Sequence, residues 1–366
     1  MKRILSQAVK ELAQFRRDRL TLALALLLPL MTLLIFGFAI RLEAKDIPIV
    51  IQDFDNSQLS RLYTEKLFAT NQFTPVNWQS APETALDYNF AKAAVMIPPD
   101  FSQRVTGNQS SEVQVIVDGT DVNNARVIKN SIKATTQAFL QDQKLIPENR
   151  LVVPETRLWF NPGREESLYI VPGVYAVVLW IFPSLLAAIA MVREKERGTI
   201  LQVYASDLTA GELILGKALA YLVVGLGMAI VIMGIGALIF RLRFAGDPMP
   251  LLIGTPLYLW ASVMFGIMLG ARTASQNAAV QGVALVGFLT ALLLSGFIYP
   301  LSNIPFPLSL VSNVVPARYF IGITRDAYVR GIGWSGVWFN LLMIFGLGLI
   351  LFNVARKALS RMQLGD

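Results

Sequence analysis

The sequence predicts an α-helical polytopic membrane protein with six transmembrane helices and an α/β domain inserted between the first two. Residues of the AVILMFWYC set make up 54% of the 366 residues and DEKR only 16%, whereas soluble domains carry about 25% charged residues. Six apolar stretches are each long enough to cross a bilayer, which takes about 20 residues. Between the first two stretches, residues 41–167 have an ordinary soluble composition.

The absence of cysteine and histidine excludes several classes of site. Without them there is no disulfide framework, no Cys or Cys/His zinc site, no thiol nucleophile and no imidazole base. We therefore predict no catalytic, cofactor-binding or metal-binding residue, and a membrane hydrolase is disfavoured.

The net charge of +7 is unevenly distributed along the chain. Residues 41–166 hold 13 basic and 16 acidic residues, and the remainder holds 19 basic and 9 acidic residues. Such a split indicates a cytoplasmic membrane face rather than nucleic-acid binding.

The N-terminal residues 1–19 predict an amphipathic helix on the cytoplasmic leaflet, although a plain extension of the first span remains an alternative. Its polar face would carry Lys2, Arg3, Lys10 and Glu11, and its apolar face Ile4, Leu5, Ala8, Val9, Leu12 and Phe15. The first span, 20–40, exceeds a signal-peptide core and lacks a small-x-small cleavage site, so we expect it to be an uncleaved anchor.

The remaining spans lie within 168–356, at approximately 168–192, 213–240, 251–270, 278–299 and 332–352. Cytoplasmic flanks of spans are enriched in Lys and Arg. With both termini inside, 14 basic residues flank the spans on the cytoplasmic side and 5 on the other. This predicts a cytoplasmic loop 193–212, a cytoplasmic tail 357–366 and an extracytoplasmic domain 41–167.

Strand and helix signals alternate within 41–167, which implies a small α/β domain. We expect strands at 47–52, 73–78, 93–97 and 112–118, and helices at 57–70, 101–105 and 123–143. A further helix would begin with a capping box from Ser80 to Glu83 and run through Lys92. Four aspartates follow strand ends and allow a metal site, but acidic residues there are more often helix caps and Asx turns. They are Asp53, Asp55, Asp118 and Asp121.

The stretch GELILGKA at 211–218 has the frame of a P-loop but not its chemistry. Ala218 replaces the hydroxyl residue that ligates magnesium, no strand precedes the glycines, and the third span has already begun. We therefore interpret Lys217 as a lysine that snorkels to the cytoplasmic headgroups. Thr209 to Glu212 has capping-box spacing and would start this span.

The loop 193–212 alternates charge sign in its first half, and 199–204 can form a short helix along the membrane. A solvated turn is the simpler interpretation. Together with LGK at 215–217, however, its EKERGT run at 194–199 resembles the cytoplasmic loop of ABC-2-type transporter permeases. SGFIYP at 295–300, IP at 304–305 and VPARYF at 315–320 resemble the signature before the last span of that family. PPDF at 98–101 and VIVDGTD at 115–121 are similar to the outer domain of its multidrug-exporter subgroup.

This resemblance implies the bacterial inner membrane, a second permease copy or paralogue, and a separate cytoplasmic ATP-binding subunit that holds ATP and Mg. A periplasmic adaptor protein and membrane lipids are further candidate partners. A charged helix between two spans would be the lever on which the ATPase acts. The predicted ATPase contacts are Glu194, Glu196, Arg197, Gly198, Thr199, Leu201 and Tyr204.

Prolines at 300, 305, 307 and 316 forbid one continuous helix in 300–330. We expect short helices that re-enter the outer leaflet and form an outer gate of Tyr299, Pro300, Pro305, Pro316, Arg318 and Tyr319. The polar residues within the spans are mild and are more often helix contacts than ligands. The weak candidates for a substrate path are Tyr258, Gln281, Thr290, Ser295 and Asn340.

The predicted function is an ABC exporter permease that moves an amphipathic, drug-like or lipid-like compound out of the cytoplasm or inner leaflet. One alternative is export of an envelope polymer or lipid-linked glycan. Another is a non-transporting receptor or sensor whose outer domain binds a ligand. An ATPase that co-purifies with the chain would separate transporter from receptor.

Overall fold

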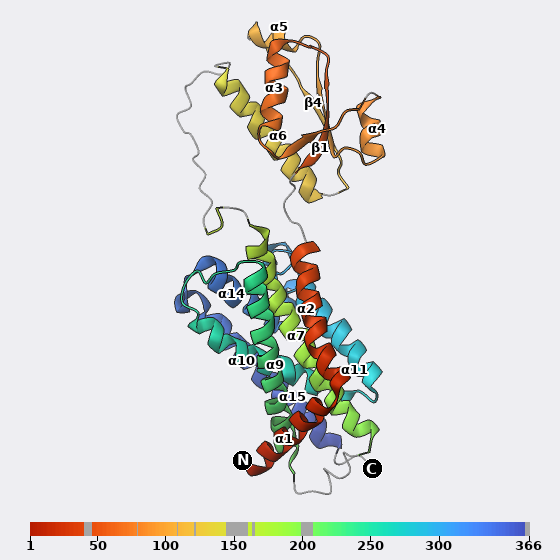
Figure 1. Cartoon of the computed structure of the whole chain (residues 1–366), viewed down its shortest axis with the longest axis vertical. Coiled ribbons are helices and arrows are strands. Elements are labelled where there is room, and N and C mark those ends of the chain that lie inside the picture. Colours follow the sequence, from red (N-terminus) through yellow and green to blue (C-terminus); the bar gives the residue numbers. More distant parts are fainter. Residues whose placement is uncertain are drawn as a thin grey trace. The chain divides into compact units, whose positions relative to one another are not determined.

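The protein is described here as a computed structural model, which covers residues 1–39, 46–78, 80–107, 109–120, 122–143, 160–162, 165–198 and 208–362. The chain divides into two compact units. One comprises Met1–Ile40 and Leu158–Asp366, and the other Arg41–Arg157. Helices make up the first unit, whereas the second is built around a β-sheet (Figure 1).

Among its described residues, the first unit contains six helices long and apolar enough to cross a membrane, as predicted. They are α2 (Arg19–Ala39), α7 (Glu166–Glu196), α9 (Ala210–Ile239), α10 (Met249–Arg272), the composite helix of α11 (Gln276–Gly282), η1 (Val283–Phe288) and α12 (Leu289–Leu293), and α15 (Trp334–Met362). The fifth span ends at Leu293 rather than near residue 299. Gly296 has φ +83°, which no right-handed helix can accommodate.

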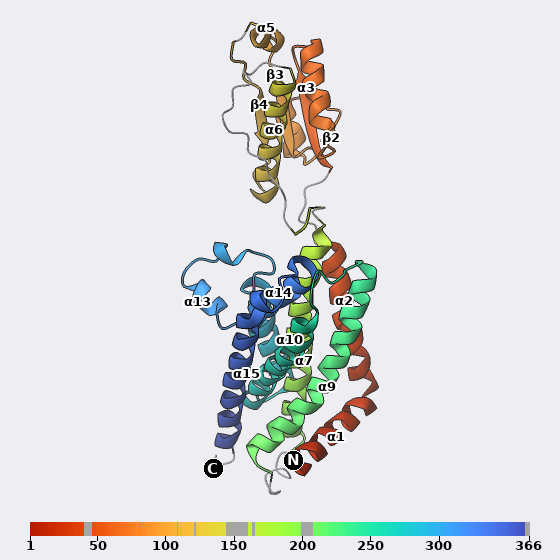
Figure 2. The ribbon, with the colours of Figure 1, turned by 90° about the vertical axis from the view of Figure 1, so that its left-hand side faces the viewer.

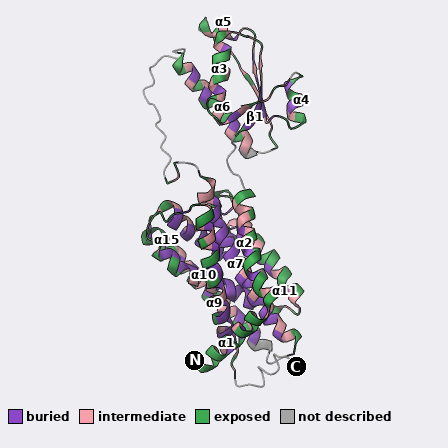
Figure 3. Cartoon of the chain, viewed as in Figure 1, coloured by how far each residue is buried: buried purple, intermediate pink, exposed green. Residues whose placement is uncertain are grey.

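Helices α7 and α10 form the centre of this unit (Figure 3). Their most apolar windows are 78% and 67% buried, against 18 to 28% for the other four spans. The two backbones touch: a Cβ added to Gly266 would lie 2.0 Å from the Ser184 carbonyl oxygen, and one added to Gly270 2.6 Å from that of Ala188. Small residues thus allow the close packing typical of membrane helices.

The N-terminal helix α1 (Lys2–Arg17) is separate from α2, because Asp18 between them has non-helical dihedrals. It packs on α9 (Figure 2). The buried face of α1 differs from the predicted one: Gln7, Ala8 and Glu11 are buried, whereas Leu5 and Val9 are each 59% exposed. Gly216 of α9 leaves the space that Gln7 fills, since a Cβ there would lie 2.7 Å from the Gln7 Cβ.

After α12 the chain runs through short helices before the last span. These are η2 (Leu301–Asn303), α13 (Leu308–Ser312), α14 (Pro316–Arg325) and η3 (Asp326–Arg330). The breaks follow the prolines, which cannot donate a backbone hydrogen bond. Re-entry of this segment into a membrane stays a prediction.

In the part of the second unit that the structure describes, four strands form a sheet in the order β2-β1-β3-β4. Strand β1 (Ile47–Asp53) is parallel to β2 (Phe73–Pro75) and β3 (Ala93–Ile97), and β4 (Gln114–Val117) is an antiparallel edge strand. The helices are α3 (Gln58–Phe68), α4 (Pro82–Asp87), α5 (Phe101–Thr106) and α6 (Val122–Asp142). The element order follows the prediction, but the capping box at Ser80 does not form. Instead α4 follows Ala81, and Pro82 in its first turn needs no donor.

The aspartates that follow strand ends act as caps and turn residues. Asp53 Oδ1 accepts hydrogen bonds of 3.0 Å from the backbone amides of Asp55 and Asn56. Asp55 Oδ1 accepts a 3.0 Å bond from the Ser102 hydroxyl, and Asp118 Oδ1 a 3.0 Å bond from the Thr120 amide. Asp121 lies outside the described residues. These contacts confirm the turn interpretation for Asp53 and Asp118, whereas Asp55 bonds to Ser102 in the first turn of α5.

Candidate coupling site at the ends of α1, α7 and α9

Lys217 of α9 is completely buried, so the prediction that it snorkels to headgroups is wrong. Its Nζ lies 2.6 Å from Glu11 Oε1 of α1 and 3.2 Å from Glu194 Oε2 of α7. The ammonium also donates to the Ala190 carbonyl oxygen at 3.3 Å. Helix α1 lies over this part of α9, which removes the lysine from solvent and supplies one of its carboxylate partners.

Local sequence positions each of these charges. The predicted capping box at the start of α9 forms, with the Thr209 hydroxyl accepting from the Glu212 amide at 3.2 Å. This places Lys217 two turns into the helix. Gln7, one turn before Glu11, donates to Glu11 Oε1 at 3.2 Å and orients that carboxylate. Glu194 lies in the last turn of α7, directly before the loop that begins at Arg197.

Lys10 of α1 completes the group, with its Nζ 3.2 Å from Glu194 Oε1. We call Lys10, Glu11, Glu194 and Lys217 the ion cluster. It contains two cations and two carboxylates, so its formal charges balance. Removing one partner from a buried ion pair strands the other charge and costs about 3 to 5 kcal/mol. The ion cluster thus joins three helices, and loss of one partner of the buried Lys217–Glu11 pair would be destabilising.

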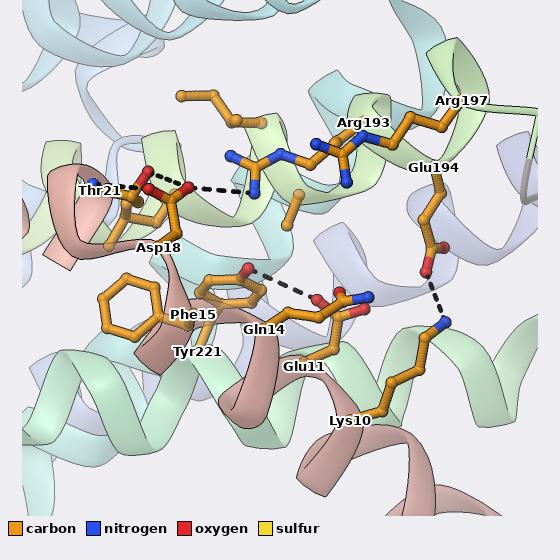
Figure 4. A pocket seen from close by; sticks show the side chains of 13 residues that line it. Lys10, Glu11, Gln14, Phe15, Asp18, Thr21, Arg193, Glu194, Arg197 and Tyr221 are labelled. Carbon is orange, nitrogen blue, oxygen red and sulfur yellow. Dashed lines mark hydrogen bonds and ion pairs between the residues drawn. The ribbon is translucent and has the colours of Figure 1, made fainter.

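A cavity of about 250 Å³ lies beside the ion cluster (Figure 4). Its wall includes Phe15 and Tyr221, whose rings meet edge to face with centroids 6.5 Å apart. On the same wall Asp18 accepts hydrogen bonds from the hydroxyl (2.6 Å) and the amide (3.1 Å) of Thr21. Arg193 of α7 lies 3.4 Å from the same carboxylate. The Thr21 hydrogen bonds chiefly, and the Arg193 charge further, lower the Asp18 pKa below its ordinary value.

The predicted ATPase contacts fall into three groups. Glu194 is buried within the ion cluster, whereas Glu196, Arg197 and Gly198 are exposed at the end of α7. Thr199, Leu201 and Tyr204 lie outside the described residues. Gly198, at φ +67°, lies just beyond the helix end.

Two further contacts bind the end of α7 to its neighbours. Glu196 accepts a 2.8 Å hydrogen bond from the Gln276 amide at the start of α11. Lys195 Nζ donates to the carbonyl oxygens of Gly270 (2.9 Å) and Thr273 (3.2 Å) at the end of α10. The residues that precede the loop thus contact α1, α9, α10 and α11.

The predicted gate residues differ in exposure. Tyr299, Pro300 and Pro305 are exposed, and Pro316 is buried in the first turn of α14. Arg318 Nη1 donates to Asn313 Oδ1 at 2.6 Å, and the Tyr319 hydroxyl to the Asn313 carbonyl oxygen at 2.8 Å. Both residues therefore hold the turn between α13 and α14.

Sequence reasoning missed the groups that satisfy the broken backbone nearby. Arg325 donates to the Gly296 carbonyl oxygen at 3.0 Å and lies 3.8 Å from the Tyr169 ring centroid. The Ser312 hydroxyl donates to the Leu294 carbonyl oxygen at 2.6 Å. Backbone groups freed in an apolar environment need such partners.

The candidate substrate-path residues are not joined to one another by any hydrogen bond that the structure describes. Tyr258 is buried, donates to the Ala176 carbonyl oxygen at 2.6 Å and stacks on Phe320 with centroids 4.1 Å apart. Ser295 is buried and donates to the Ala291 carbonyl oxygen. Gln281 is exposed, and Thr290 and Asn340 are half-buried. The contacts of Tyr258 are those of helix packing, and that of Ser295 is a local bond at the end of α12.

Comparison with known proteins identifies the family. Over 358 residues the chain is 28% identical to the probable multidrug ABC transporter permease YbhR of Escherichia coli, with 95% of this chain and 96% of the relative covered. It is 26% identical to the permease YbhS of the same organism, over 90% of this chain and 89% of the relative. The ABC transporter G family member 20 of Dictyostelium discoideum is 20% identical over 96% of this chain and 50% of its own length. Residues 19–357 match the ABC-2 family of transporter proteins, and the chain therefore belongs to that family.

Proposed function

We propose that the chain is the membrane subunit of an ATP-driven exporter of amphipathic, drug-like or lipid-like compounds, with ATP hydrolysed by a separate cytoplasmic subunit. The names of its relatives as multidrug ABC transporter permeases support the transport class. Apart from Lys217, which is paired with carboxylates, and the charges at the helix ends, the polar residues of the spans are mild, which suits an amphipathic cargo better than a strongly charged one. A second copy of the chain, or a paralogue, completes the transporter.

The observation that carries the coupling proposal is the position of Glu194. It lies in the last turn of α7, at the edge of the loop, and its carboxylate meets Lys10 of α1 and Lys217 of α9. Its side chain is only 8% exposed and offers little surface to a partner protein. We therefore assign Glu194 to transmission within the chain, and direct contact with the ATPase to the exposed Glu196, Arg197 and the loop that follows.

Transmission through buried charges has a definite physical character. Separating Lys217 from Glu11 or Glu194 would leave unpaired charges in a buried environment, so intermediate separations are unfavourable. A displacement of the end of α7 therefore moves α1 and α9 with it. Packed elements with discrete arrangements transmit motion in this way.

The test is charge reversal at Arg197, which is exposed and lies after the last residue of α7. Arg197→Glu should weaken pull-down of the ATP-binding subunit, since loss of an interfacial charge pair costs about 2 to 5 kcal/mol of binding. Expression should not change, because exposed substitutions usually shift stability by no more than about 0.5 kcal/mol. The matched control is Arg243→Glu, an exposed arginine predicted on the opposite side of the membrane. Equal pull-down of both variants would remove the coupling assignment.

The proposed orientation places both termini and the loop 193–212 in the cytoplasm and the α/β unit outside. The chain has no cysteine, so single cysteines report topology directly. A membrane-impermeant thiol reagent should label Asn108→Cys in intact cells and Gln202→Cys only after lysis. Labelling of Gln202→Cys in intact cells would show that the orientation is the opposite of the proposed one.

A further inference from the structure

The inner face of the α/β sheet is unevenly covered. On β3 the residues of this face, Ala93, Val95 and Ile97, are fully buried. On the neighbouring edge strand β4, the cross-strand partners Val117 and Val115 are only half-buried. The helix that should cover them, α6, is instead held to α3, where the Tyr63 and Thr136 hydroxyls lie 2.8 Å apart. An apolar strip is therefore left open along β4.

This strip forms one wall of a groove of about 720 Å³ between β4 and α6. Val115 and Val117 line it from the strand, and Ala125 and Ile132 from the helix. An adjoining cavity of about 440 Å³ shares Val115 and Ile132 and continues toward the aromatic rings of Tyr63, Phe101 and Phe139. Both volumes lie within the range of about 300 to 1,000 Å³ typical of small-molecule sites.

The rim of the groove is cationic. Arg126, Lys129 and Lys133 line it and follow one another at spacings of three and four residues, so they lie on one side of α6. All three are exposed, and within the described ranges none forms an ion pair with a carboxylate. Three like charges along one helix edge repel one another, and a bound anion would relieve that repulsion.

We propose that this groove binds a single-chain fatty acid, with its acyl chain on the valine wall and its carboxylate against Arg126, Lys129 and Lys133. The apolar groove between one strand and one helix fits one acyl chain, and its cationic rim complements an anionic head group. This site belongs to the α/β unit alone. Binding there needs neither ATP nor the ATPase subunit, so it can be tested separately from the proposed export function.

The experiment uses the full chain in nanodiscs of zwitterionic lipid, without the ATPase. The probe is decanoate that carries a terminal photoreactive diazirine, and the charge-reversed control is the corresponding decylamine. After irradiation, mass spectrometry of peptides should find decanoate adducts on β4 and α6, with about tenfold less labelling by the amine. Lys129→Glu with Lys133→Glu should reduce decanoate labelling by a similar factor. Arg61→Glu, an exposed cation of α3 outside the groove, should leave it unchanged.

A second variant distinguishes loss of the binding site from misfolding caused by the double charge reversal. Ala125→Trp keeps all three cations but fills the groove, and it should also abolish labelling of β4 and α6. Thermal melts of each variant check folding, and the comparison of decanoate with decylamine on the wild-type chain stands without any variant. Equal labelling by the two probes would overturn the proposal, as would adducts confined to the membrane helices.

Discussion

Two regions of the helical unit satisfy buried polar groups by different means. At the ends of α1, α7 and α9, charged side chains meet one another across three helices. Between α12 and α15, Arg325 and the Ser312 hydroxyl instead meet backbone carbonyls exposed by the helix break. The first arrangement depends on opposite charges in contact, and the second on where the helix break leaves carbonyl oxygens without a backbone partner. The first is thus suited to holding helices in discrete positions, and the second to stabilising one broken path of the chain.

The largest expected effect comes from unbalancing the ion cluster. Lys217→Met keeps the volume of the side chain but leaves Glu11 and Glu194 as buried carboxylates without their shared ammonium. We expect a loss of about 3 to 5 kcal/mol, measured as a lower thermal midpoint of the purified protein. Lys2→Met, on the exposed end of α1, is the control and should melt like the wild type.

A double variant sharpens this prediction. Glu11→Gln combined with Lys217→Met restores the charge balance, so it should be more stable than Lys217→Met alone. Neighbouring residues in one network give such non-additive energies of about 0.5 to 3 kcal/mol. If the losses of stability in the two single variants simply added in the double variant, Glu11 and Lys217 would be unrelated contacts and not members of one ion cluster.

A smaller effect is expected at the broken segment, where the lost partners are neutral carbonyls. Arg325→Met removes donors from the carbonyl oxygens of Gly296 (3.0 Å) and Phe297 (3.4 Å). The cost should be about 1 to 3 kcal/mol, with faster amide hydrogen exchange in peptides covering residues 294–300. Arg330→Met, at an exposed arginine of η3, should change neither quantity. A loss as large as that of Lys217→Met would erase the distinction between the two regions.

The six spans were predictable because length and apolar composition are local properties. The end of the fifth span was not. The local sequence stays apolar through Ile298, and the helix stops where Gly296 turns to positive φ and Arg325, 29 positions later, takes the freed carbonyl. The start of α4 was missed for a different, local reason: Ser80 has the chemistry of an N-cap, but the helix begins with Pro82.

The ion cluster was not predicted, although one feature of the sequence, a lysine inside an apolar span, pointed to it. A lysine inside an apolar span is a candidate functional group by itself, and Lys217 was instead assigned to the headgroups. Its partner Glu11 is 206 positions away, and Lys10 and Glu194 are 184 positions apart. Periodicity placed Glu11 on the polar face of α1, but it cannot reveal that this face packs on another helix.

The smallest expected effect lies at the edge of the same region, where Asp18 is partly exposed and bonded chiefly to Thr21. Because the folded-state pKa of Asp18 is lowered, its carboxylate stabilises the fold above the unfolded-state pKa of about 3.9. That contribution is lost as the pH falls through the lower folded-state value. Asp18→Asn should therefore cost up to about 1 kcal/mol at pH 7 and progressively less below pH 4.

Melting midpoints of wild type and Asp18→Asn across this pH range measure the difference. Asp87→Asn, at an exposed carboxyl of the α/β unit, is the control. A gap that stays constant to the lowest pH would show that Asp18 acts through shape rather than charge.

The contact between α7 and α10 limits which amino acids two positions of the chain can hold. Even the single methyl of alanine at 266 would lie 2.0 Å from a carbonyl oxygen of α7, and at 270 it would lie 2.6 Å from another. Neither obstacle is a flexible side chain that could rotate away, so accommodation requires separating two backbones. Even glycine to alanine, the smallest substitution, is therefore expected to disrupt the packing at these two positions. Where the glycines of the other four spans have a close neighbour, the nearest atom belongs to a side chain, such as that of Phe240 at Gly37 or Tyr175 at Gly236.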